Sequence, residues 1–188
     1  VTKSFASPLV KTLFIGQNTI FLESADSTNI YASNLIRQNN VPEGTVVYTH
    51  QQTKGRGQRG TIWESEPNKN ATFSIILHPT FLLAEKQYLL TKIVSLAVSD
   101  ILSEFLYPTD NSGKVKIKWP NDIYVDENKI AGILIENTLR ENYLHHSIIG
   151  IGININQIKF WSSDNATSLA LLAGKEFDVK EIIGKLCY

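Results

Sequence analysis

The sequence predicts an α+β fold in which a mixed, largely antiparallel sheet is covered by helices on one face. Two patterns support this prediction. The strand patterns between residues 115 and 154 follow one another through short turns and leave no helical segment between them. One long helical pattern, at 84–106, precedes them. A doubly wound parallel fold is disfavoured, because parallel neighbours need a crossover helix between them.

The first part of the chain is predicted to hold short strands and one helix. The strands are predicted at 19–22, 45–49 and 71–77, the second of them from its β-branched residues. A helix is predicted at 28–38. Ser27 is placed to cap it, because a serine oxygen accepts the free amides of a first helical turn.

The helix at 84–106 has the clearest pattern. Its apolar residues recur at spacings of three and four, as on one face of a helix: Leu90, Val94, Val98, Ile101 and Phe105. Four more apolar residues widen that face: Leu89, Ile93, Leu96 and Leu102. The width of this face predicts a well-buried helix.

The second half is predicted to form longer strands, at 115–119, 123–125, 130–138 and 144–154. A Pro120–Asn121 corner joins the first two strands. Residues 126–128 form a hairpin turn, since Asp and Asn side chains satisfy turn backbone locally. Asp178, with Glu181 three residues later, predicts a capped final helix.

Composition indicates one globular domain over residues 1–188, with 43% hydrophobic residues. The 18 basic and 18 acidic residues argue against binding nucleic acid mainly through phosphate charge, which needs a basic surface. Cys187 is the single cysteine, so no internal disulfide can form; it is predicted to be inert, and the composition fits a cytoplasmic location. The longest apolar stretch, 148–155, is too short to cross a membrane.

A glycine-rich loop is predicted at 53–60 and contains the run GRGQRG. Its glycines allow close backbone approach, and its two arginines supply planar forks that match a carboxylate or a phosphate. The alternatives are a plain solvated turn or an RNA-binding arginine–glycine segment, although no repeat follows it. The composition also predicts that this loop is mobile.

Three further segments hold more polar residues or glycines than a core needs: 118–122 (KWPND), 129–134 (KIAGIL) and 150–156 (GIGININ). Asn121 and Asp122 could present an amide and a carboxylate at a strand end, or be ordinary turn residues. Lys129 is a candidate for neutralising a transferred phosphate, or it simply reaches water from an apolar strand. Glycines inside a strand mark a bulge or a close-approaching ligand, so the third segment, with Asn154, could face a nucleotide.

Other catalytic sets have little support in the sequence. The four histidines, at 50, 78, 145 and 146, lack metal-ligand spacing with a cysteine or an acidic partner. No serine lies in a nucleophile elbow, and the phosphate-loop pattern of glycine, four residues and Gly-Lys-Ser is absent.

Taken in order, these segments resemble the biotin protein ligases. The matching segments are 26–29 (DSTN), 52–57 (QTKGRG), 59–60 (RG), Trp63, 118–122 (KWPND), 129–136 (KIAGILIE), 150–154 (GIGIN) and 166–169 (ATSL). Each is weak alone, but their order and spacing form a specific signature over about Phe21 to Leu169. The resemblance implies a sheet related to that of the class II aminoacyl-tRNA synthetases. It also implies an ATP-dependent ligase that forms biotinyl-5′-AMP from biotin and ATP, with magnesium, and then transfers biotin to a lysine of a biotin carboxyl carrier protein.

The resemblance also implies roles for individual residues. Lys129 is expected to contact the biotin carboxylate and the α-phosphate, Arg56 to lie in a loop that closes over the adenylate, and Asp122 to orient the acceptor lysine. The residues expected to bind biotin are Ser27, Thr28, Asn29, Gln52, Gly55, Arg56, Gly57, Gln58, Lys129 and Gly132. Those expected to bind ATP are Arg59, Trp63, Asn121, Lys129 and Asn154. The residue chemistry agrees with these roles. The biotin carboxylate and the ATP phosphate are both anions, and the positive charges of Arg56 and Lys129 would offset their repulsion.

Departures from the family's pattern and three rival interpretations stay open. Gln58 stands where some relatives carry another arginine, so the loop's hold on the adenylate could differ. The chain is expected to lack both a DNA-binding helix-turn-helix domain and the family's small C-terminal β-barrel, and without the former no DNA partner is expected. No membrane partner is expected because the apolar stretches are short, and exposed sheet edges make a homodimer plausible. The rivals are a lipoate or octanoate ligase of the same superfamily, a non-catalytic biotin or nucleotide sensor, and an RNA-binding module.

Overall fold

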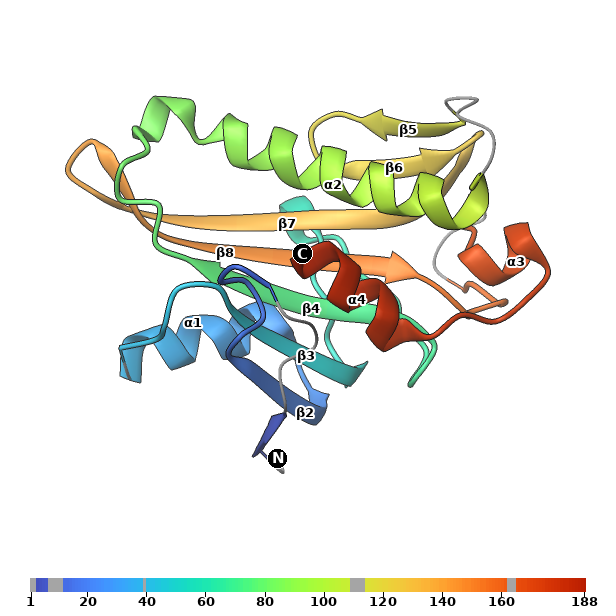
Figure 1. Ribbon diagram of the computed structural model, residues 1–188, viewed down its shortest axis with the longest axis horizontal. Coiled ribbons are helices and arrows are strands. Elements are labelled where there is room, and N and C mark those ends of the chain that lie inside the picture. Colours follow the sequence, from blue (N-terminus) through green and yellow to red (C-terminus); the bar gives the residue numbers. More distant parts are fainter. Residues whose placement is uncertain (1–2, 7–11, 39, 109–113, 162–164) are drawn as a thin grey trace.

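The computed structural model describes residues 3–6, 12–38, 40–108, 114–161 and 165–188 (Figure 1). Its sheet has eight strands in the order β1-β2-β3-β4-β8-β7-β6-β5. The strands are β1 (Lys3–Ala6), β2 (Thr19–Ala25), β3 (Thr45–Gln52), β4 (Asn70–Leu77), β5 (Val115–Lys118), β6 (Asp122–Val125), β7 (Asn128–Arg140) and β8 (Tyr143–Asn154). The helices are α1 (Thr28–Gln38), α2 (Tyr88–Leu106), α3 (Leu169–Ala173) and α4 (Val179–Cys187), with two short 3₁₀ turns, η1 (Gln58–Gly60) and η2 (Ala84–Lys86).

The strand pairing confirms the predicted mixed, largely antiparallel sheet. β2 and β3 are parallel, because α1 connects them as a crossover, and the other neighbouring strands pair antiparallel. β7 and β8 form the longest hairpin, in which Gly132 lies opposite Gly152 and Leu134 lies opposite Gly150. This register places glycines side by side in the middle of the sheet.

Helices lie on both faces of the sheet, so the prediction that they cover one face was wrong. α1 packs on the face that carries Val47 and Ile148, whereas α2 and α4 pack on the face that carries Val46 and Ile149. Neighbouring residues of a strand point to opposite faces, which is why both members of each pair are buried. Figure 1 shows α2 lying along β5, β6 and β7, while α1 lies at the β2–β3 end. The α1 face is therefore left without a helix over β6 and β7.

Helix α2 is less buried than its apolar pattern predicted. Leu90, Val98 and Leu102 are buried, as expected, but Ile93 is 63% exposed and Leu96 is 54% exposed. A helix that packs on one layer buries only one stripe of its surface, so apolar residues beyond that stripe face solvent. The 3₁₀ turn η2 takes up the start of the predicted 84–106 segment.

The C-terminal helix has the cap that the sequence predicted. The Asp178 side chain accepts hydrogen bonds from the backbone amides of Lys180 and Glu181, at the start of α4. Cys187, near the end of α4, is buried, and burial raises the pKa of its thiol to about 12, in agreement with the prediction that it is inert. Among the described residues, none of the helices combines the length and the hydropathy that crossing a bilayer requires.

Candidate active site

A cavity of about 810 Å³ lies on the α1 face of the sheet, beside the part that α1 leaves uncovered. Small-molecule sites typically enclose ~300–1,000 Å³, so its size suits one substantial ligand or two smaller ones. Nearly all the residues predicted to act here line it: Ser27, Thr28, Asn29, Gln52, Arg56, Gly57, Gln58, Arg59, Trp63, Asn121, Asp122, Lys129, Gly132 and Asn154. The exception is Gly55, a buried residue whose carbonyl accepts a hydrogen bond from the Trp63 amide.

The floor of the cavity is made flat by glycines of β7 and β8. A Cβ atom on Gly152 would lie 2.4 Å from the Trp63 indole, and one on Gly132 would lie 3.0 Å from it. A Cβ atom on Gly150 would lie 2.3 Å from Asn29 Oδ1. Real Cβ atoms do not approach other atoms so closely, so a larger residue at 150 or 152 would force Asn29 or Trp63 to move. The glycines of segment 150–156 therefore allow the Asn29 and Trp63 side chains to lie directly against the sheet.

The glycine-rich loop is folded as a small hairpin over this floor. The Gly57 amide donates to the Thr61 carbonyl at 2.8 Å, and Arg56 pairs with Ile62 in an isolated β-bridge. The tip is the 3₁₀ turn η1, where Arg59 has the left-handed φ of 53°. This hairpin brings Arg56 to Glu136 and the Trp63 indole to Lys129, whose Nζ lies 5.8 Å from the ring centroid. The predicted mobility of the loop stays a prediction.

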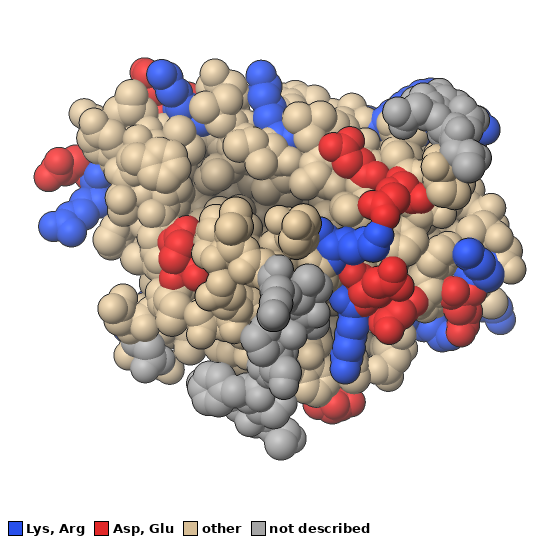
Figure 2. All heavy atoms as spheres, viewed as in Figure 1, with Lys and Arg blue, Asp and Glu red and all other residues tan. Residues whose placement is uncertain are grey.

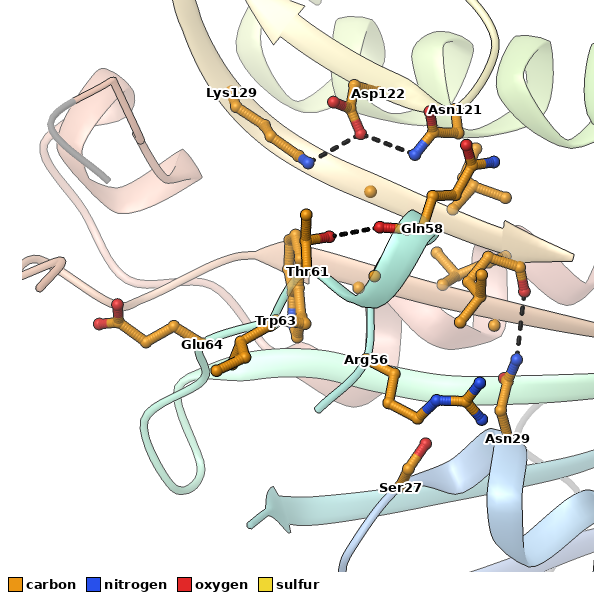
Figure 3. A pocket seen from close by; sticks show the side chains of 18 of the residues that line it. Ser27, Asn29, Arg56, Gln58, Thr61, Trp63, Glu64, Asn121, Asp122 and Lys129 are labelled. Carbon is orange, nitrogen blue, oxygen red and sulfur yellow. Dashed lines mark hydrogen bonds and ion pairs between the residues drawn. The ribbon is translucent and has the colours of Figure 1, made fainter. Parts of the chain in front are cut away.

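Lys129 and Asp122 meet at the other side of the cavity. Lys129 Nζ lies 2.7 Å from Asp122 Oδ1, and Asn121 Nδ2 donates to the same oxygen at 3.0 Å (Figure 3). The backbone of Lys129 is fixed as well, because its amide donates to the Asn165 carbonyl and its carbonyl accepts from the Thr167 amide. Segments 118–122, 129–136 and 166–169, which are separate in the sequence, thus form one structural unit.

Buried polar side chains form the end of the cavity nearest α1. Gln52 Oε1 accepts from the Thr28 amide at 2.8 Å, and the hydroxyls of Thr28 and Ser74 lie 2.7 Å apart. Thr28 is 3% exposed and Ser74 is fully buried. Polar groups buried to this extent are costly unless they are bonded, so this end of the cavity is preorganised for hydrogen bonding.

Two buried polar atoms at the cavity have no hydrogen-bond partner among the described residues. They are Trp63 Nε1, a donor, and Asn154 Oδ1, an acceptor. Asn154 Nδ2 is used, since it donates to the Thr167 carbonyl at 2.9 Å. A buried atom without a partner loses the hydrogen bond it made to water, and a ligand that supplies the partner recovers it.

The charges around the cavity favour an anionic ligand. Its described lining includes the basic side chains Arg56, Arg59, Lys118 and Lys129 and the acidic side chains Glu64 and Asp122. On the face that Figure 2 draws, acidic and basic side chains lie next to one another. Within the part of the chain that the structure describes, no group of three or more His, Cys, Asp or Glu residues is arranged to hold a metal ion.

Several lining residues were not singled out from the sequence: Thr61, Ile62, Glu64, Phe73 and Phe160. Phe160 belongs to a segment with no helical or strand periodicity, so no local signal pointed to it. The Glu64 carboxylate holds that segment in place, because it accepts from the backbone amide of Trp161 at 3.0 Å and from Gln157 Nε2 at 3.1 Å.

Comparison with known proteins gives one consistent result. Residues 21–154 match the model of the biotin/lipoate A/B protein ligase family. The bifunctional ligase/repressor BirA of Bacillus subtilis (strain 168) is 37% identical over 179 residues, which are 93% of this chain and 53% of that protein. The biotin–[acetyl-CoA-carboxylase] ligase of Paracoccus denitrificans is 33% identical over 135 residues, which are 71% of this chain and 53% of that protein. The chain therefore spans about half the length of these relatives.

Solved structures agree with the sequence comparisons. The biotin protein ligase from Aquifex aeolicus in complex with biotin and ATP superimposes with a TM-score of 0.73 at 35% identity, over 90% of this chain and 66% of that one. The biotin protein ligase from Leishmania major in complex with biotin gives a TM-score of 0.71 at 28% identity, over 88% of this chain and 69% of that one.

Proposed function

We propose that this chain, which belongs to the biotin/lipoate A/B protein ligase family, is the catalytic part of an ATP-dependent biotin protein ligase. The observation that carries the proposal is the cavity itself. It places the cations of Lys129 and Arg56 around a flat glycine floor, next to buried hydrogen-bonding groups. The names of the relatives, and the biotin and ATP in the Aquifex aeolicus complex, favour biotin as the substrate.

In the first half-reaction, a biotin carboxylate oxygen attacks the α-phosphorus of ATP. A P–O bond forms, the bond from the α-phosphorus to the bridging oxygen breaks, and pyrophosphate leaves with that electron pair. Both reactants are anions, so the step needs positive charge at the point of contact. Lys129 supplies it when its ammonium group moves from Asp122 to the reacting phosphate, and Arg56 supplies it from the loop above.

The rest of the lining divides into two subsites in this proposal. The biotin subsite consists of the polar end, with Ser27, Thr28, Asn29 and Gln52, and of the neighbouring lining residues Gly57, Gln58 and Gly132. Gly55 does not line the cavity, so it would support this subsite only through the backbone of the hairpin. The nucleotide subsite consists of Arg59, Trp63, Asn121 and Asn154. Its support is the pair of buried, unpartnered atoms Trp63 Nε1 and Asn154 Oδ1, which offer one donor and one acceptor.

In the second half-reaction, a lysine amine of the acceptor attacks the biotinyl carbonyl carbon and AMP leaves. The attacking amine must lose its proton, since a free lysine has a pKa of about 10.4 and is charged at neutral pH. Asp122 is the carboxylate at the reacting centre, and it becomes available when Lys129 turns to the phosphate. We assign Asp122 to orienting the amine and accepting its proton. The acceptor is proposed to be a biotin carboxyl carrier protein.

Magnesium fits this cavity as a cofactor that arrives with ATP. Mg²⁺ at nucleotide sites takes most of its ligands from phosphates and water and only one or two from carboxylates. The carboxylates of the described lining, Asp122 and Glu64, match that requirement. When bound, the ion would offset the charge on the ATP phosphates.

A cytoplasmic location is proposed because ATP and the carrier protein are both expected there. A homodimer and the absence of a DNA partner stay predictions. Sedimentation at several protein concentrations measures the first, and titration of labelled duplex DNA measures the second.

The direct test is biotin-dependent release of pyrophosphate from ATP with magnesium, with lipoate measured in parallel. Release with biotin alone is the expected result. Release with lipoate alone would replace this proposal by its main rival. Binding of biotin without any release would instead favour a sensor.

A further inference from the structure

We propose that Glu136 is a positioning residue of the ligase, which holds Arg56 over the cavity before any ligand binds. This inference rests on the proposed function, because it concerns the arginine assigned there to the adenylate. Glu136 lies on β7 and is outside the residues that line the cavity.

Glu136 binds two different parts of the site through its two carboxylate oxygens. Oε1 accepts from Arg56 Nη2 at 3.1 Å, and Oε2 accepts from Asn29 Nδ2 at 2.8 Å. Figure 3 shows Arg56 and Asn29 extending toward one another at the polar end of the cavity. Glu136 therefore joins the glycine-rich hairpin to the first turn of α1.

The Asn29 end of this link is rigid. Its Nδ2 also donates to the Leu134 carbonyl at 3.2 Å, so the amide nitrogen faces two acceptors and Oδ1 must face Ser74. An amide oxygen only accepts, so the Ser74 hydroxyl donates to Asn29 Oδ1 at 2.6 Å. The Thr28 hydroxyl lies 2.7 Å from Ser74 Oγ and 3.2 Å from Gln52 Oε1, so Asn29 is held within a buried polar cluster.

The Arg56 end of the link is adjustable. Arg56 and Glu136 side chains are 44% and 36% exposed, and half-exposed ion pairs of this kind are weak. A guanidinium has five N–H donors, and the bond to Glu136 uses Nη2 alone. Among the described residues the Arg56 side chain is oriented by this one weak bond, while its remaining donors face the cavity and could bind an anionic ligand. That arrangement reduces the ordering cost of ligand binding without blocking it.

Glu136→Gln is expected to break the contact with Arg56 while it keeps the hydrogen bond with Asn29. Glutamine keeps the shape of glutamate but has one oxygen and one NH₂ group. Because Asn29 is 3% exposed, whereas Arg56 is half-exposed, the single oxygen should stay with Asn29. The NH₂ group would then face Arg56, another donor, and release it. Glu127→Gln, at the exposed turn between β6 and β7, is the matched control because it makes the same chemical change away from the cavity.

The rate of trypsin cleavage in the hairpin measures, without any ligand, how firmly Glu136 keeps the hairpin in place. Arg56 and Arg59 are cleavage sites in the hairpin, and a released Arg56 should make that segment easier to cleave. We expect Glu136→Gln to raise cleavage after Arg59 about fivefold, the factor that a half-exposed ion pair supports, while Glu127→Gln leaves it unchanged. If Glu136→Gln does not fold, Glu136→Asp replaces it, because aspartate keeps the charge but withdraws it by one methylene. An unchanged cleavage rate in the folded variant would overturn the proposal.

A double-mutant cycle measures positioning toward the ligand. The probe is a sulfamoyl analogue of biotinyl-AMP, which binds without reacting, and the measured quantity is its dissociation rate. Glu136→Gln should raise that rate about fivefold in the parent enzyme and not at all when Arg56 is already alanine. Equal effects in both backgrounds would show a purely structural role, and no effect in the parent would also contradict the proposal. If the parent binds no analogue and releases no pyrophosphate, the proposed function fails, and the trypsin result still decides whether Glu136 holds the hairpin.

Discussion

Lys129→Ala should slow adenylate formation for two separate reasons. The first is the loss of the positive charge at the reacting phosphate. The second comes from Asp122, which lies 2.7 Å from the ammonium group and would be left as an uncompensated anion beside two other anions. Changing Asp122 to Asn as well would remove the second effect alone.

The magnitudes follow from the burial of the pair. Lys129 and Asp122 side chains are 31% and 22% exposed, so an effective dielectric constant of about 20 is appropriate, and a charge ~4 Å from the phosphate contributes at most ~4 kcal/mol. Loss of one preorganised charged donor typically slows a reaction by about 10²–10³-fold. At ~6 Å the residual Asp122 charge adds roughly 1–3 kcal/mol of repulsion, depending on how far water screens it. The double variant should therefore recover about tenfold of the lost rate.

The assay is single-turnover pyrophosphate release with biotin, ATP and magnesium and without acceptor protein. Leaving the acceptor out matters, because Asp122 is assigned to the second half-reaction and its loss would mask any recovery there. A normal rate in Lys129→Ala would refute the role of its charge. If the double variant reacts as slowly as the single variant, or more slowly, the unpaired Asp122 carboxylate does not contribute to the slower adenylate formation.

Four further predictions test other parts of the structure. Arg56→Gly should let biotinyl-AMP escape, seen as more biotin on lysines of an added bystander protein; a tightly retained adenylate would contradict the role of the arginine. Gly152→Ala should displace the Trp63 indole, 2.4 Å from the new Cβ, with a shift in indole fluorescence and weaker ATP binding; unchanged spectra and binding would count against the contact. The pKa of His146 is lowered below 6.5 by burial, and further by His145 and His78, so the unfolded chain binds more protons as the pH falls through about 6.5 and the folded state loses stability there. His146→Gln should reduce the drop in melting temperature between about pH 7.5 and about pH 5.5, and an unaltered drop would exclude His146 as its source. Asp178→Ala should lower the free energy of unfolding by about 1 kcal/mol in a denaturant titration, because α4 loses its cap; an unchanged midpoint would mean that the cap is dispensable.

The residues that the sequence singled out lie around one cavity, whereas the layers of the fold were predicted less accurately. Motif order brought Lys129, Arg56 and Asp122 into one prediction, because each is marked by local chemistry or by a recognisable neighbour. Ile93 was predicted to be buried because periodicity gives the width of an apolar face, and that width does not reveal how many layers pack on it. The unbroken apolar run at 46–48 did indicate that both faces of the sheet are covered. A strand with one face in solvent alternates apolar and polar residues instead.

Glu136 and Ser74 show what local patterns miss. Ser74 is an ordinary polar residue within a strand, and its importance arises only because β4 brings it against α1. Glu136 belonged to a recognised motif, yet its partners Arg56 and Asn29 come from two other segments. Hydrogen-bond chains of this kind depend on the register of strands and on the docking of helices, and neither leaves a periodic trace in the sequence.

The close contacts on the cavity floor also constrain how the protein can change over evolution or in a selection experiment. Gly150 is tied to Asn29, and Gly152 is tied to Trp63, because in each pair the backbone of one member lies where the side chain of the other needs room. A larger residue at 150 becomes acceptable only if position 29 first becomes smaller, and the same order applies to 152 and 63. In a combinatorial library these positions should therefore vary as pairs, so changing the size of the ligand that the floor accepts requires coordinated substitutions.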